Sequence, residues 1–187
     1  MRANRRTHSL LLGFALSLMM MPSGWASLDQ RSEPTVTTDP REEEARALIL
    51  SLTSARPEQR KEAADRLRSE HQWAVESLDQ LVLEMVNTMN AQLPQRLDQV
   101  TYFENVSFFG KQLIYHMRFL FGEGDIAPDQ VVALKQELKR RLLNQVCPSA
   151  SLAGFLAFGR MISVNTLFAD HSSFFTSNIR WEDCLVR

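Results

Sequence analysis

The chain of 187 residues is poor in the side chains that most often carry out chemistry, with two cysteines and four histidines. The cysteines are not spaced as Cys-x-x-Cys, and no two histidines stand at the short spacing of a zinc site. A Gly-rich phosphate loop, a Gly-x-Ser-x-Gly motif and a calcium loop are also missing from the sequence. We therefore expect no catalytic residues, no cofactor and no metal, and we interpret the protein as a non-enzyme.

Neither sign of charge dominates, because 21 lysines and arginines stand against 22 aspartates and glutamates, for a net charge of −1. Nucleic-acid binding needs a basic surface, which this composition does not favour. Long apolar runs are scarce too, and none reaches the about 20 residues that cross a bilayer. We expect no nucleic-acid partner and no membrane span.

Residues 1–26 have the three parts of a secretory signal peptide. Arg2, Arg5 and Arg6 form a positive start, an apolar run follows from Leu10 to Met21, and Ala26 ends the segment. The apolar run is too short for a transmembrane helix. We expect cleavage near Ala26 and export, which would leave a periplasmic or secreted protein.

The expected export bears on the chemical state of the two cysteines. In an oxidising compartment a lone pair of cysteines usually forms a disulfide. We predict a bond between Cys147 and Cys184, which would tie the end of a helix to the end of the last strand. A nucleophilic or redox thiol is the alternative, and the wide spacing of the pair argues against it.

Three further segments follow the signal peptide. Residues 27–40, with Pro34 and Pro40, are predicted to be a flexible linker, and residues 71–187 an α+β domain. Residues 41–70 carry seven basic and seven acidic side chains and form a charged helical extension. Its apolar stripe leaves two interpretations open, namely two solvated helices joined by a break, or an arm that docks a partner.

Helical and strand-like periods alternate along the domain. Apolar residues recur at helical spacing over residues 67–93 and 129–146. Residues 99–121 and 160–181 alternate instead, around turns at Gly110–Lys111 and Asp170–Ser172, and each is predicted to be an antiparallel hairpin. The order helix, hairpin, helix, hairpin predicts an α+β fold with a four-stranded antiparallel sheet packed against helices.

Three functions are compatible with these residues. The main hypothesis is an exported accessory factor that binds another protein, and the alternative is a carrier of a small apolar ligand, suggested by the phenylalanine and methionine content. A hydrolase using His116 or His171 is the third. Asp170, His171 and Ser172 are triad residue types but lie side by side, whereas a working triad converges from separate parts of a fold. A turn explains this run better.

A resemblance covers residues 89–184. This region is similar to the quorum-sensing-regulated virulence factor family of small exported bacterial proteins. The resemblance implies a sandwich with a four-stranded antiparallel sheet, and it implies no catalytic residues. Val164, Thr166 and the turn at residues 169–171 depart from the family's second hairpin. The matching residues are Met89, Asn90, Leu93, Pro94, Leu97, Asp98, Thr101, Leu113, Tyr115, Cys147, Pro148, Leu156, Gly159, Asp183 and Cys184.

Overall fold

The computed structural model of the protein describes residues 39–54 and 56–186. The predicted signal peptide and almost all of the predicted linker lie outside these residues. Two helices open the described chain, α2 (Pro40–Ser51) and α3 (Pro57–Glu70). Each begins with a proline, which suits the first helical turn because that position needs no amide donor. Asp39 caps α2, and its side chain accepts a hydrogen bond from the Arg41 amide at 2.9 Å.

The sheet has five strands, in the order β1-β2-β3-β4-β5. Helix α4 (Ala74–Asn90) leads into β1 (Gln95–Arg96), β2 (Thr101–Phe109) and β3 (Gln112–Phe119). A short 3-10 turn, η3 (Glu123–Asp125), precedes the long helix α5 (Pro128–Val146). Helix α6 (Ala150–Ala157), strands β4 (Met161–Leu167) and β5 (Ser173–Ile179) and helix α7 (Trp181–Leu185) complete the chain.

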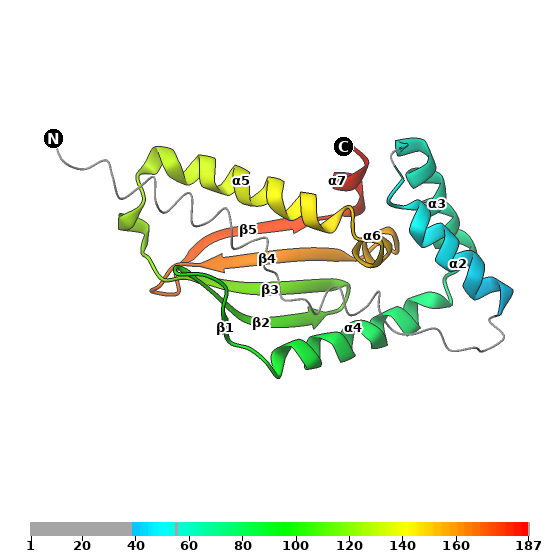
Figure 1. The fold of residues 1–187 in the computed structure, drawn as a ribbon, viewed down its shortest axis with the longest axis horizontal. Helices are drawn as coiled ribbons and strands as arrows, with labels where there is room; N and C mark the ends of the chain where they lie inside the picture. The colour runs from blue at the N-terminus through cyan, green and yellow to red at the C-terminus, as the bar shows by residue number, and fades with distance from the viewer. Residues whose placement is uncertain (1–38, 55, 187) are drawn as a thin grey trace.

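The α+β class is confirmed. The predicted four-stranded antiparallel sheet is wrong in two respects, because the sheet has a fifth strand and one pair of neighbouring strands is parallel. Strand β1 is a further edge strand, and β3 pairs with β4 in parallel, while the other neighbours are antiparallel. The chain leaves β3 at one end of the sheet, and α5 carries it back along the strands (Figure 1). Strand β4 therefore starts at the same end as β3, as a helical crossover requires.

One face of the sheet is buried beneath the helices. Along β3, Leu113, Tyr115, Met117 and Phe119 are buried, and the residues between them are only half-buried. The buried residues of α5 recur at helical spacing (Leu134, Leu138, Leu142 and Val146). Helix α4 packs against β2 and α5 against β5, so the two long helices run along opposite edges of the sheet in the view of Figure 1.

The helical segment that we predicted as continuous over residues 67–93 is broken. Helix α3 ends at Glu70, and α4 begins at Ala74. Leu67 is buried beside α6 and α7, whereas Val82 and Val86 are buried on the helix that contacts β2. One straight helix could not present its apolar face to both layers, so the chain turns at His71.

Helices α2 and α3 of the charged extension pack on the rest of the domain. They lie against each other and against α6, and α3 also contacts α7, at one end of the sheet (Figure 1). Leu52 and Leu67 are fully buried there. Arg60 donates a hydrogen bond from Nη1 to the Cys184 carbonyl at 2.8 Å, and Arg68 donates from Nε to the Ala157 carbonyl at 2.6 Å.

Cys147 and Cys184 form a disulfide in the structure, with their Cα atoms 5.4 Å apart. Cys147 follows the last residue of α5, and Cys184 lies in α7 just beyond β5. The bond therefore joins the crossover helix to the C-terminal end of the sheet, in agreement with the predicted pairing. None of the helices in residues 39–54 and 56–186 has the length and apolarity needed to cross a bilayer.

Candidate functional site

A cleft of about 790 Å³ lies at the end of the sheet where β2 meets β3. Its wall on the sheet side is the turn Phe109–Gln112 together with the start of β4 at Met161. Arg68 of α3, Leu156 of α6 and the segment 180–182 at the start of α7 supply the rest. Ligand sites in proteins commonly have volumes of about 300–1,000 Å³, so the cleft has room for a short peptide segment.

The cleft is lined by four cationic side chains, two of which are fixed by partners. Arg160 is buried and donates from Nε and Nη2 to the two carboxylate oxygens of Asp79 on α4, the Nε–Oδ1 distance being 3.0 Å. Arg68 is held by the Ala157 carbonyl and lies 3.4 Å from a carboxylate oxygen of Asp65. These contacts hold the two arginines against the walls of the cleft.

The other two cations, Lys111 and Arg180, are exposed. Within the described part of the chain, neither forms an ion pair. Phe109 stands beside them and is 82% exposed, although the neighbouring Phe108 packs on Phe155. Gly110 has a φ of 60° and lets the β2–β3 turn close tightly between Phe109 and Lys111. The cleft thus combines an exposed aromatic ring with two available positive charges, and Glu182 is the acidic residue in its lining.

A smaller cavity of about 220 Å³ lies between α5 and the buried face of the sheet. Leu142 and Val146 of α5 face Ile162 and Val164 of β4, and Tyr115 of β3 contributes a ring. Burial raises the pKa of the Tyr115 hydroxyl, so this group stays neutral at every physiological pH. The lining is thus mostly apolar and carries no charged side chain, which suits a small uncharged group.

His116, one of the two histidines of the hydrolase hypothesis, lies in β3. Its Nε2 atom is 3.0 Å from the Ser107 hydroxyl oxygen on β2, a contact that sequence reasoning missed because the two residues meet diagonally across a hairpin. Burial lowers the pKa of His116, and the nearby Glu104 acts in the opposite direction. Glu104 is itself engaged by Arg118. Neither Ser107 nor His116 lines the cleft or the cavity beneath α5, so a substrate in either of these spaces would not reach the pair.

His171, the other histidine of that hypothesis, belongs to a tight turn between β4 and β5. It is exposed and has a φ of 65°. The Asp170 carboxylate accepts hydrogen bonds from the amide and hydroxyl of Ser172, at 2.9 and 2.6 Å, and these bonds lower the pKa of Asp170. Asp170 thus organises the turn rather than orienting His171, in accord with the turn interpretation.

A third group of residues brings together side chains that are far apart in the sequence. The carboxylates of Glu44 and Glu70 lie beside the imidazole of His71, with one ligand atom from each within 4.8 Å of the others. Sequence reasoning missed this cluster because it weighed only spacings between histidines. The adjacent residues Glu70 and His71 are the part of this cluster that the sequence could have indicated. Glu44 joins them only because α2 folds against α3.

The sequence matches no protein-family model and no curated protein. Among solved structures, this chain is similar to a Pseudomonas aeruginosa protein described as a candidate secreted protein, with 13% identity, a TM-score of 0.47, and coverage of 58% of this chain and 93% of the other. A pilotin of the type 2 secretion system of Vibrio vulnificus gives 15% identity, a TM-score of 0.47 and the same coverage.

The type II secretion pilotin of Vibrio cholerae gives 13% identity and a TM-score of 0.43, and covers 58% of this chain and 94% of its own. At these values the similarity implies no shared function. The class of the protein follows from its own structure, which is an α+β domain with a mixed five-stranded sheet.

Proposed function

We propose that the protein is an exported, non-catalytic accessory factor that binds an acidic and partly apolar segment of another protein in the cleft at the β2–β3 turn. The observation that supports this most strongly is the position of Phe109, which is 82% exposed at the rim of the cleft. An isolated aromatic ring in this position serves as an anchor in many protein interfaces.

The charges around Phe109 favour an acidic partner. The whole chain has a net charge of −1, so the positive side chains of the cleft are a local feature rather than a general one. Lys111 and Arg180 would attract carboxylates and orient them toward the ring. Arg160 and Arg68 are already bound within the fold, so the walls need little rearrangement when a segment enters.

Site-specific photo-crosslinking in the exporting cell tests this proposal. A photoreactive phenylalanine analogue at position 109 should give one defined cross-linked partner. Replacing both Lys111 and Arg180 by glutamate should abolish that product, because two attractive charges become repulsive. Lys139→Glu is a control for charge reversal elsewhere on the surface, since this exposed lysine lies on α5 and does not line the cleft. The proposal fails if the product persists in the double variant, or if the control loses it equally.

Direct binding identifies the chemistry of the segment. Peptides derived from the cross-linked region should bind the purified protein in fluorescence anisotropy. Neutralising their acidic residues, or replacing Phe109 by alanine, should weaken binding by at least about tenfold, as expected for an interface anchor. Equal binding of acidic and neutral peptides would overturn the proposed chemistry.

Carriage of a small apolar ligand is a second candidate, favoured by the cavity beneath α5. Its volume of about 220 Å³ is below the range of most ligand sites, so only a small molecule would fit. Native mass spectrometry of freshly purified protein should then show an added mass. Leu142→Phe, which fills the cavity from α5, should remove that mass. Failure to detect any added mass in the unmodified protein would reject this function.

A further inference from the structure

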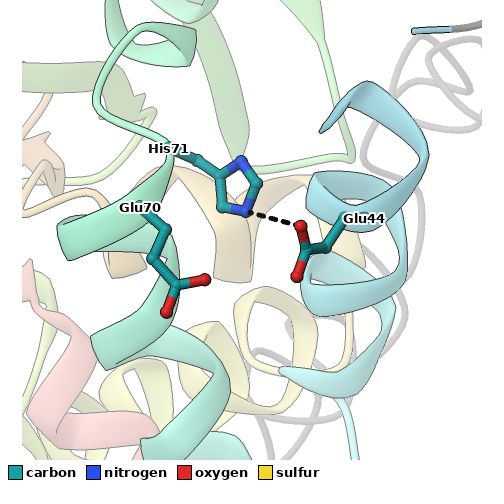
Figure 2. A group of neighbouring side chains, drawn as sticks. All are labelled: Glu44, Glu70 and His71. Atoms are coloured by element: carbon teal, nitrogen blue, oxygen red, sulfur yellow. Dashed lines mark ion pairs between the residues drawn. The ribbon is translucent and has the colours of Figure 1, made fainter. Parts of the chain in front are cut away.

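His71 is a buried imidazole with two unused nitrogen atoms. It is 2% exposed, and neither Nδ1 nor Nε2 has a hydrogen-bond partner among the described residues. Buried polar atoms without partners are uncommon in folded proteins and call for a ligand or another explanation. The Nε2 atom points toward a carboxylate oxygen of Glu44 at 4.0 Å, as Figure 2 shows.

Two carboxylates stand around this imidazole. Glu44 projects from α2, and Glu70 is the last residue of α3, directly before His71. The three ligand atoms lie within 4.8 Å of one another. Zinc–oxygen and zinc–nitrogen distances of about 2.0 Å place tetrahedral ligands about 3.3 Å apart, so the flexible glutamates need to move inward by only about an ångström.

We propose that Glu44, Glu70 and His71 form a binding site for a divalent cation of the zinc type. One imidazole and two carboxylates form a ligand set that zinc accepts, with water in the fourth position. The imidazole favours zinc over calcium or magnesium, which prefer oxygen ligands alone. The bound ion would connect α2 to α3 and so fix the angle of the helical hairpin on the domain.

Arg66 is the internal competitor for this site. Its guanidinium contacts Glu44 and lies 3.1 Å from a carboxylate oxygen of Glu70. Arg66 is 40% exposed and has room to turn into solvent when a doubly charged ion enters. The arginine thus holds the two glutamates together without the metal and opposes metal binding.

Titration of the protein purified after export, stripped with a chelator and dialysed, tests the site. Isothermal titration with Zn²⁺ should show one ion bound per chain. Glu44→Gln and Glu70→Gln should each weaken binding by at least about tenfold, and Arg66→Gln should tighten it. Both glutamates are exposed, so these variants should still fold. His171→Ala is the matched control, because it removes an exposed imidazole in a distant turn.

A spectroscopic readout reports on the histidine itself. The ring centroids of His71 and Trp73 are 6.2 Å apart, so Co²⁺ bound at His71 should quench Trp73 fluorescence, and Trp73→Phe should remove that signal. Unsaturable binding, no binding, or unchanged affinity in both glutamate variants would overturn the proposal. The outcome is independent of the cleft, because none of these residues lines it.

Discussion

Arg160, directly before β4, is joined to Asp79 of α4 by a partly buried ion pair. The arginine is buried, and its fork binds Asp79, whose side chain is 30% exposed. Arg160→Ala should lower the free energy of unfolding by about 2 kcal/mol, which is less than the about 3–5 kcal/mol for breaking a fully buried pair, because water still reaches Asp79. Urea unfolding followed by far-UV circular dichroism measures this value.

Arg140→Ala is the matched comparison for Arg160. Arg140 also binds a carboxylate with two nitrogen atoms, at 2.7 and 2.8 Å from the oxygens of Glu137, but this pair lies on the surface of α5. Its loss should cost less than about 1 kcal/mol. If the two variants lost equal stability, burial could not be the cause of the Arg160 effect.

Glu137 makes the stability depend on pH in the acid range. Hydrogen bonds from Arg140 and Arg141 lower the pKa of Glu137 to about 2 in the folded protein. A lowered folded-state pKa stabilises above the unfolded value, near 4.5, and the gain is lost as pH falls toward 2. Glu137→Gln should therefore flatten this part of the stability–pH curve, by about 0.5 kcal/mol for an exposed pair.

Denaturant unfolding at pH 6, 4 and 2.5 checks this prediction. The native protein and Glu137→Gln should differ at the highest pH and converge at the lowest. A difference that stayed constant over the whole range would show that the ionisation of Glu137 is not coupled to folding.

At the scale of elements, the sequence predicts local structure better than pairing. Period and turn residues correctly indicated α4, α5 and the two hairpins β2–β3 and β4–β5. The parallel contact of β3 with β4 has no local signal, because it depends on how far α5 carries the chain. Helix α6 was missed as well, since its eight residues are almost all buried and therefore show no amphipathic period.

Asn90 protects the edge of the sheet where β1 is too short to do so. Strand β1 pairs with only two residues of β2, and beyond them the Asn90 side chain donates to the Val106 carbonyl at 2.7 Å and accepts from the Val106 amide at 2.8 Å. Asn90→Ala should cost about 2 kcal/mol for two lost bonds and make the chain aggregate more readily.

Asn90→Asp is the informative control for this edge. It keeps the acceptor for the Val106 amide but removes the donor to the carbonyl, so its stability should lie between those of the native protein and Asn90→Ala. Thermal unfolding with light scattering measures both properties. Unchanged scattering in Asn90→Ala would mean that the edge needs no such protection.

At the scale of the whole molecule, the candidate cleft could not be predicted from the sequence. Phe109 and Lys111 belong to a turn that the pattern indicated, but Arg68, Arg160 and Arg180 join them only through the packing of α3, α6 and α7 at one end of the sheet. The role of the charged extension could not be predicted from the sequence either. Two of its arginines, Arg60 and Arg68, donate hydrogen bonds to carbonyls of α7 and α6, which a list of charges along the chain does not reveal.

The disulfide links the stability of the whole molecule to the cleft. Cys184 lies two residues beyond Glu182, so the bond to Cys147 anchors the wall formed by residues 180–182. Replacing both cysteines by serine should lower the free energy of unfolding by up to about 4 kcal/mol. Without the bond, the unfolded chain regains the conformational entropy of the loop between the two cysteines, which are 37 residues apart.

The same double variant tests whether the disulfide stabilises mainly α7 and the cleft wall or the fold as a whole. Arg60 still holds the Cys184 backbone carbonyl, so α7 should remain docked but open more often. Hydrogen exchange should therefore accelerate most in α7 and the end of β5, and less in β2 and β3. Peptide binding in the cleft should weaken in parallel, because part of the binding energy must first order the loosened wall. Uniform acceleration over all strands would instead show that the bond stabilises the fold as a whole and has no special role at the cleft.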